Sequence, residues 1–389
     1  MDGATNNLMW TEPYDGDLSD IFGIQAEIAM NIANSLRADF SVAEQESIET
    51  PPTNSPEAYA LFLKAVTLVR QGIGGGSDAS IATRLAIQNF LDEALELDPE
   101  FAVAHALKAG VYGSSRFFDS VRNEEDWLAF SAEIDRLRVE HASMALALDP
   151  SLGRAHAVLA TVHLNNWRGA EAEAEAEQAL RLSPNDPTTA ALFADIEGVV
   201  RNRIDDAIRY QERRAQLDPN NAQAFNTLGA YLNQARRFDE ALGALQQCLV
   251  LDPLDGGCRR QMALSEFALG HHEQALDSLR ALQQVSGPAS LAFIAPGFGL
   301  LGQPDDALRS FERIREISAE QYIDPVIWAW AYMGIGDYDE ALNRLNIAAE
   351  NPKLIQVGFM AWFFMGNIWR DPMLEETAFV EVREKLRPR

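Results

Sequence analysis

The sequence is poor in the features of secreted and membrane-spanning proteins. It has two cysteines, Cys248 and Cys258, which are too few for a disulfide framework. Its longest apolar run, 357–365, is broken by Gly358 and is far shorter than the roughly 18 to 20 residues that span a bilayer. The polar, acidic start lacks the basic stretch and apolar centre of a signal peptide. We therefore expect a cytoplasmic chain without a membrane span, and leave open an anchor lost from its amino terminus.

Positive charge is also scarce. The chain has 58 Asp and Glu residues against 32 Lys and Arg residues, which gives a formal net charge of −26. Contacts with phosphate groups need clustered Lys and Arg, and no basic run occurs, so we do not expect nucleic acid as a partner. The acidic surface would attract a basic protein partner, although an ordinary solvated acidic face is the simpler interpretation.

One short motif is abundant. Leu-Asp-Pro or Leu-Ser-Pro ends at Pro99, Pro150, Pro184, Pro219 and Pro253, and the last four prolines are 34, 35 and 34 residues apart. Proline stops a helix at the preceding residue and is tolerated in the first turn of the next one, so each motif joins two helices. A period of this length predicts a stack of helix-turn-helix units instead of one closed core.

The clearest unit runs from Asn220 to Pro253. Apolar and small residues at helical spacing mark a first helix with Phe225, Leu228, Gly229 and Leu232, and a second with Ala241, Leu245, Cys248 and Leu249. Gly229 and Ala241 fit a close crossing of the two helices. The segment AQAFNTLGAYLNQARRFDEALGALQQCLVLDP resembles a tetratricopeptide repeat (TPR) in its aromatic residue, its Leu-Gly pair, its Phe-Asp-Glu-Ala-Leu turn and its closing proline.

Looser copies extend the array in both directions. The inter-helix turn recurs at 270–276, 302–308 and 336–342, and an earlier pair of helices is predicted at 56–70 and 81–97. The interval of 51 residues from Pro99 to Pro150 predicts a longer loop and second helix around 114–128. The resemblance thus implies an all-α, right-handed α-α superhelix (TPR solenoid) of about eight helix pairs over 51–353, with capping helices in 354–389, at 354–369 and 373–386.

The first fifty residues have no TPR match. The stretches Leu8–Asp15 and Leu18–Ala29 resemble the end of the TolB-like segment of bacterial signalling proteins, in which an adenylate cyclase or winged-helix domain precedes the TPRs. The stretches 54–64 and 367–373 resemble the first repeat and the ending of the same family. The resemblance implies that 1–50 hold a remnant of this segment and an amino-terminal helix. The catalytic or DNA-binding half is missing and Gly16 replaces an Arg, so a fragment and an autonomous adaptor both stay open.

Signatures of catalysis, cofactors and metals are weak. The glycine-rich stretch 72–77 lacks the Gly-Lys-Ser/Thr ending of a phosphate loop, and we expect a connection between helices. The adjacent His271 and His272 point about 100° apart on a helix and have no third ligand at a suitable spacing. Asp205, Asp206, Asp305 and Asp306 begin second helices, where carboxylates favour the positive end of the helix dipole. We therefore expect no enzyme activity, no cofactor and no metal.

A TPR array binds partners mainly along its concave face, which the first helix of each unit lines. Reading the positions that alternate with packing residues predicts a groove of Arg154, Asn165, Gln223, Asn226, Asn233, Arg260, Phe267 and Trp330. Amides and Arg suit an extended peptide backbone, and the two aromatic residues suit apolar side chains. The family's lysine-rich clamp for a terminal carboxylate has no equivalent here. The predicted function is a noncatalytic protein-interaction module of a bacterial signalling system. The alternative is an accessory region that presents substrate to, or regulates, a cyclase-like domain encoded elsewhere.

Overall fold

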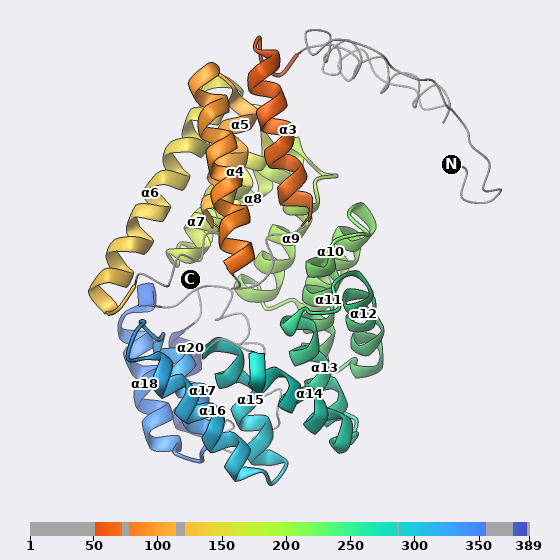
Figure 1. Cartoon of the computed structure of the whole chain (residues 1–389), viewed down its shortest axis with the longest axis vertical. Coiled ribbons are helices and arrows are strands. Elements are labelled where there is room, and N and C mark those ends of the chain that lie inside the picture. Colours follow the sequence, from red (N-terminus) through yellow and green to blue (C-terminus); the bar gives the residue numbers. More distant parts are fainter. Residues whose placement is uncertain (1–50, 72–77, 114–120, 286–287, 355–375, 387–389) are drawn as a thin grey trace, which may run out of the picture.

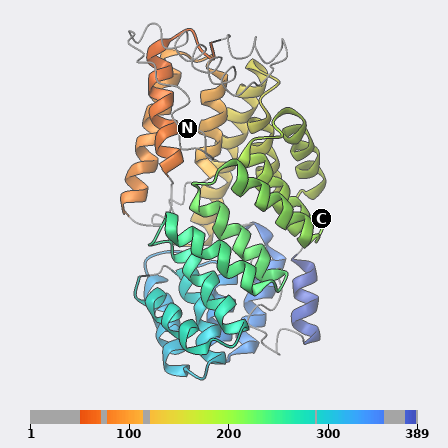
Figure 2. The same cartoon turned by 90° about the vertical axis from the view of Figure 1, so that its right-hand side faces the viewer.

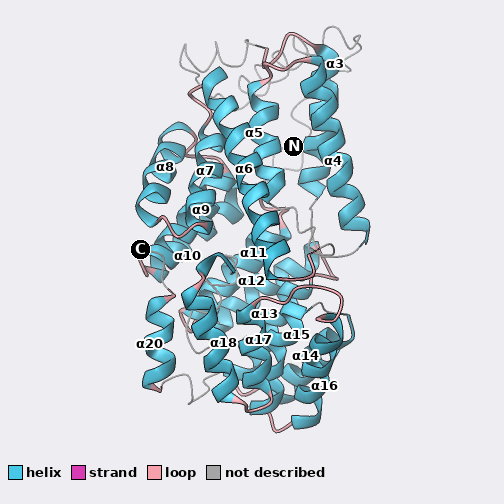
Figure 3. Cartoon of the chain, turned by 90° about the vertical axis from the view of Figure 1, so that its left-hand side faces the viewer, coloured by secondary structure: helices cyan, strands magenta, loops and turns pink. Residues whose placement is uncertain are grey.

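The computed structural model describes residues 51–71, 78–113, 121–285, 288–354 and 376–386, and these residues form helices and no strands (Figure 3). The expectations for 1–50, for the 72–77 connection and for nearly all of the first capping helix lie outside these ranges. Eight antiparallel pairs follow one another, as expected: α3 (Pro56–Gln71) with α4 (Asp78–Leu97), α5 (Ala102–Gly113) with α6 (Glu124–Leu148), α7 (Gly153–Asn165) with α8 (Gly169–Leu182), α9 (Pro187–Asp195) with α10 (Ile204–Leu217), α11 (Ala222–Gln234) with α12 (Phe238–Leu251), α13 (Gly256–Ala268) with α14 (His272–Val285), α15 (Pro288–Leu300) with α16 (Pro304–Ile317), and α17 (Pro325–Gly334) with α18 (Tyr338–Glu350).

The pairs stack as a right-handed superhelix that turns through the whole molecule (Figures 1 and 2). A short 3-10 turn, η4 (Pro352–Leu354), follows α18, and α20 (Thr377–Lys385) confirms a helix within the second expected cap. Phe379 of α20 lies edge-on against Tyr338 of α18, with ring centroids 6.4 Å apart. No described helix is both long and apolar enough to cross a bilayer.

Small residues set the helix crossings, as the sequence indicated. Gly229 in α11 faces Leu245 in α12 so closely that a Cβ at Gly229 would lie 2.5 Å from Leu245 Cγ. Ala241 is fully buried at the same crossing. The contact between α15 and α17 is closer still, because a Cβ at Gly334 would lie 2.4 Å from Ala295 Cβ.

The turn inside each of six successive pairs has one residue in the left-handed region, at Trp167, Asn202, Arg236, Gly270, Gly302 and Gly336. The next residue donates its backbone N–H to a carbonyl in the preceding helix, as in Arg237 N to Leu232 O at 2.9 Å. This C-terminal cap reaches back five residues in five of the pairs. In the α9–α10 pair it reaches back six, from Arg203 N to Glu197 O at 2.6 Å.

A π-helical turn, η3 (Ile196–Val200), follows α9 and explains that exception. The interval from Pro184 to Pro219 is the one of 35 residues, and a π-turn holds one residue more than an α-turn. The extra residue is therefore accommodated within the helix. In the four later pairs the cap again reaches back five residues.

Helix α6 confirms the expected lengthening of the second pair. It has 25 residues, and the Asn123 side chain caps its amino terminus by accepting from Asp126 N. The start of α6 reaches down to the last helix pair (Figure 1). There Trp127 packs in a small buried cluster that includes Val121 and Leu354. The superhelix is consequently closed on itself at this point.

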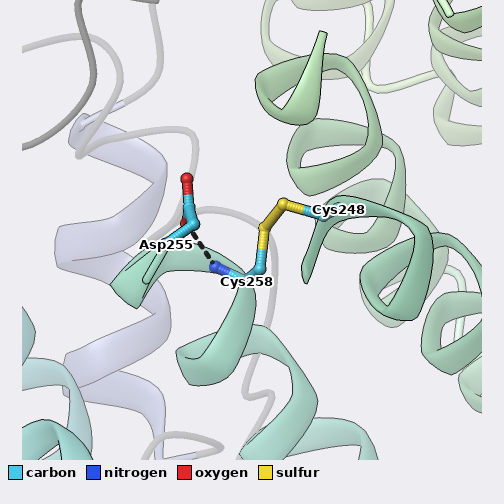
Figure 4. Close-up of side chains that lie close together, drawn as sticks. All are labelled: Cys248, Asp255 and Cys258. Carbon is cyan, nitrogen blue, oxygen red and sulfur yellow. Dashed lines mark hydrogen bonds between the residues drawn. A yellow bond between two sulfur atoms is a disulfide. The ribbon is translucent and has the colours of Figure 1, made fainter. Parts of the chain in front are cut away.

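Cys248 and Cys258 form a disulfide that joins the end of α12 to the start of α13 (Figure 4). Their Cα atoms are 6.4 Å apart, and both residues are fully buried. Cys248 does sit at a helix-packing position, as the sequence indicated. The sequence analysis does not predict this bond, because two cysteines are too few to indicate a disulfide framework.

Candidate interaction surface

The predicted groove residues come from the first helices α7, α11, α13 and α17. The structure separates them into two groups by burial. Asn226, Asn233 and Trp330 are buried, with 5%, 2% and 4% of their surface exposed. Gln223 is exposed, and the rest are half-buried: Arg154, Asn165, Arg260 and Phe267.

The buried group corrects the sequence analysis, because these side chains are not available to a partner in this structure. Asn233 in α11 donates to Gln261 O and Oε1 in α13, at 3.0 and 3.1 Å, and its Oδ1 accepts from Ser265 Oγ at 2.6 Å. These bonds hold two successive first helices together. Asn233 is therefore a structural residue of the α11–α13 interface.

Asn226 and Trp330 are buried for reasons of close packing. The Asn226 amide lies over Gly257 in the next first helix, where a Cβ would come within 2.4 Å of Asn226 Nδ2. The ring of Trp330 lies against Phe293 of α15, with centroids 5.8 Å apart. The small residues of α15 and α17 bring these two helices so close that the tryptophan becomes part of the core.

Two arginines of the accessible group reach the next first helix, and we call these two contacts the polar row. Arg154 Nη2 in α7 donates to Thr188 Oγ1 in α9 at 3.3 Å. Arg260 Nη1 in α13 donates to Ser290 Oγ in α15 at 3.2 Å. In both cases a guanidinium reaches across to the hydroxyl of the next first helix. These two contacts lie three repeats apart, one between α7 and α9 and the other between α13 and α15.

Arg260 also lies over an aromatic ring. Its guanidinium carbon is 5.1 Å from the centroid of Phe293, and the Phe293 ring also lies against Trp330. The structure thus joins Arg260 and Trp330 through a residue that the sequence analysis did not single out. Phe267 at the end of α13 stacks on His272, with centroids 5.8 Å apart. Arg154 and Asn165 lie on α7 and belong to a different part of the row.

Cys248, Asp255 and Cys258 are the one group in the described ranges with metal-ligand atoms within 4.8 Å of one another (Figure 4). Both sulfur atoms are used in the disulfide, and Asp255 Oδ1 accepts from Cys258 N at 2.8 Å as the cap of α13. This arrangement explains the three residues without an ion. The group does not include His271 or His272.

Comparison with known proteins gives the same picture of the fold. A model of the family described as anaphase-promoting complex, cyclosome, subunit 3, matches residues 200–282. A protein of Rhizobium meliloti (strain 1021) described as putative adenylate cyclase 3 is 33% identical over 106 residues. That match covers 27% of this chain and 17% of the relative, so the chain matches only a small part of that protein's length.

Solved structures extend the likeness to nearly all of the chain. An IFIT1 monomeric mutant with Gppp-AAAA aligns with a TM-score of 0.52 over 92% of this chain and 74% of that one, at 14% identity. A tetratricopeptide repeat protein from Parabacteroides merdae aligns over 72% of this chain and 100% of its own, at 12% identity and a TM-score of 0.43. At these identities the likeness concerns the fold alone.

Proposed function

The chain is a tetratricopeptide-repeat protein, and we propose that it binds a segment of another protein along the polar row of its first helices. The observation that carries the proposal is the pair of contacts Arg154–Thr188 and Arg260–Ser290, in each of which an arginine of one first helix donates to a hydroxyl of the next first helix. Arginine donors suit the carbonyl groups of an extended segment, and a half-buried Phe267 suits an apolar side chain.

The proposed role is noncatalytic. The carboxylates of Asp255 and Asp186 cap the amino termini of α13 and α9, which accounts for these two side chains without a reaction. A regulatory role in a cyclase-like signalling system is supported by the partial match to a putative adenylate cyclase. An accessory role, in which the array presents substrate to such a domain, is the alternative. We place this role in the cytoplasm, with a protein partner and no nucleic acid.

The proposal also covers the division of the chain. It assigns 51–353 to the TPR array, 354–389 to the carboxy-terminal cap, and 1–50 to a remnant of a TolB-like segment with a helix. The segment boundaries are the ones that the repeat spacing indicates.

A pull-down from lysate of the source organism tests the binding surface. We expect the double substitution Arg154→Glu and Arg260→Glu to release a captured protein that wild-type chain retains, with a loss of at least roughly 2 kcal/mol. Arg313→Glu is the matched control, because Arg313 is 62% exposed in α16 and pairs only locally with Glu316. If the double variant still captured the protein and the Arg313 variant did not, the binding surface would lie on the second helices.

A further inference from the structure

We propose that the closed superhelix is a two-lobed clamp, with a hinge in the α9–α10 pair and a seam between the start of α6 and the last helix pair. One lobe is α3 to α8, and the other is α11 to α20. The hinge is the covalent connection between them, and the seam is where they touch again (Figure 1). This inference does not depend on the binding row or on any partner.

The seam rests on a few residues at the start of α6. Trp127 Nε1 donates to Lys353 O at 3.1 Å, and Tyr322 N donates to Val121 O at 2.7 Å. The indole of Trp127 also stacks on the ring of Tyr322, with centroids 6.0 Å apart. The hydrophobic cluster here is separate from the cores of both lobes. A contact of this size can open without disturbing the packing between successive repeats.

The hinge is recognisable by comparing equivalent positions in the second helices. Each begins with a buried alanine, and the positions four and seven residues later face the first helices. Five of the six second helices from α8 to α18 carry apolar residues there: Ala176 and Ala179, Leu245 and Cys248, Leu279 and Leu282, Phe311 and Ile314, and Leu345 and Ala348. In α10 the two positions hold Gln211 and Arg214.

These polar substitutions weaken the packing of the α9–α10 pair. Gln211 is only 1% exposed, and its Oε1 has no hydrogen-bond partner. Asn226 Oδ1 in the facing helix α11 is buried without a partner as well. A buried polar atom that lacks its hydrogen bond costs free energy, typically about 1 to 3 kcal/mol. The neighbouring pairs also hold buried polar atoms without a partner, so what distinguishes α10 is the loss of apolar contacts at Gln211 and Arg214. For that reason we expect the α9–α10 pair to open more easily than its neighbours.

A buried charge adds to this effect. Asp195 at the end of α9 lies near Arg214, and its Oδ1 accepts from the Tyr231 hydroxyl at 3.0 Å. Burial raises the pKa of Asp195 to about 6, and the Tyr231 hydrogen bond and the charge of Arg214 oppose that rise. The π-turn η3 begins at the next residue, and π-turns inside helices often mark functional positions.

The hydrophobic cores divide at the same place. Leu192, Phe193 and Ile196 pack into a core with α7 and α8. Ala194 and Val199, from the same stretch of chain, pack into the large core of the other lobe. The α9–α10 pair thus belongs partly to each lobe. Tyr210 in α10 packs against both cores as well, so this pair is where the two cores meet.

Distances across the seam test the clamp in the full chain. Spin labels on cysteines introduced at Glu125 and Glu350 report the separation of the two lobes, since both positions are exposed and the native cysteines are paired. We expect one narrow distance distribution for the parent, and a broader, longer one after Trp127→Ala and Tyr322→Ala. The control Phe311→Ala removes an aromatic contact with Tyr332 inside one lobe and should leave the distribution unchanged. An unchanged distribution in the seam variant, with its helix content intact, would overturn the seam.

Hydrogen exchange of the unmodified chain tests the hinge without any substitution. We expect the amides of α9 and α10 to exchange on the order of tenfold faster than those of α7–α8 and α11–α12, because Gln211 and Arg214 replace apolar contacts that α8 and α12 keep. The substitution Gln211→Leu, which installs the residue found at the equivalent Leu245, should reduce this difference. Equal protection across all three pairs would overturn the hinge.

Discussion

Gly198 leaves the space that the ring of Tyr231 occupies: a Cβ at Gly198 would lie 2.5 Å from Tyr231 Cε1. Tyr231 is 1% exposed, and its hydroxyl is fixed by Asp195 Oδ1 at 3.0 Å and Ala194 O at 3.1 Å. The ring cannot move aside without breaking these contacts. The π-turn and the tyrosine are therefore one structural unit.

This relationship predicts the effect of adding one methyl group. Gly198→Ala should lower the free energy of unfolding by about 1 to 3 kcal/mol, because the new Cβ overpacks the site. Gly110→Ala is the control, since its nearest atom, Val158 Cγ2, is 3.9 Å away and α5 gains from alanine. Urea unfolding followed by circular dichroism measures both. Equal stability of the two variants would contradict the packing described.

A second prediction concerns the crossing of α11 and α12. Gly229→Leu should cost about 1 to 3 kcal/mol of stability, because its side chain would begin 2.5 Å from Leu245 Cγ. Gly243→Leu in α12 serves as the matched control, since a Cβ there meets nothing within 4 Å. Thermal melts should separate the two variants by several degrees. A Gly229 variant that melts like the parent would refute the crossing.

The disulfide gives a third prediction. Closing a loop of 10 residues restricts the unfolded chain, so reduction of Cys248–Cys258 should lower stability by roughly 2 to 3 kcal/mol. The measurement is thermal unfolding with and without a dithiol reductant. The double variant Cys248→Ala and Cys258→Ala should be insensitive to the reductant. If the reductant still lowered the stability of that variant, the loss of stability would not come from breaking this disulfide.

Asp195 predicts a dependence of stability on pH. Its pKa is raised from 3.8 to about 6 in the folded protein, so between these values the folded state binds a proton that the unfolded state does not. Its contribution to stability is complete below pH 3.8 and is lost as the pH rises through 6. Asp195→Asn should therefore gain stability over the parent between pH 4 and pH 7. A constant difference across that range would argue against the shift.

The pair of His105 and His141 acts in the opposite direction. Their Nδ1 atoms are 2.9 Å apart, and His105 Nε2 lies 3.0 Å from Pro99 O. Burial, with the nearby Lys108 and His105 charges, lowers the pKa of His141 from 6.5 to about 4. This contribution is present above pH 6.5 and is lost as the pH falls towards 4. His141→Gln should flatten the acid side of the stability profile, which melts at several pH values would show.

The sequence predicted the eight pairs because prolines and small residues act locally. The proline of each Leu-Asp-Pro or Leu-Ser-Pro motif follows the end of a helix, and Gly229 fits a crossing regardless of the rest of the chain. Pro296, which has no such motif before it, lies inside α15. The burial of Asn233 and Trp330 depends instead on how tightly neighbouring first helices approach. The spacing of residues within one repeat does not determine the distance between neighbouring first helices.

The seam and the hinge differ in how far the sequence predicts them. Trp127 and Tyr322 stand 195 residues apart, and no sequence pattern links them. Gln211 and Arg214, by contrast, were visible: aligning the second helices shows them as the polar exception. The single interval of 35 residues pointed to the same repeat.

The seam has a consequence for the order of folding. Contacts between adjacent helices form over short stretches of chain, whereas the bond from Trp127 to Lys353 joins residues 226 positions apart. Contacts that close such long loops form slowly, so the repeats should assemble first and the seam last. In an open array the terminal repeats have a neighbour on one side and fray independently. Here the second helix pair contacts the end of the eighth. Unfolding near one end of the array should therefore be coupled to unfolding near the other.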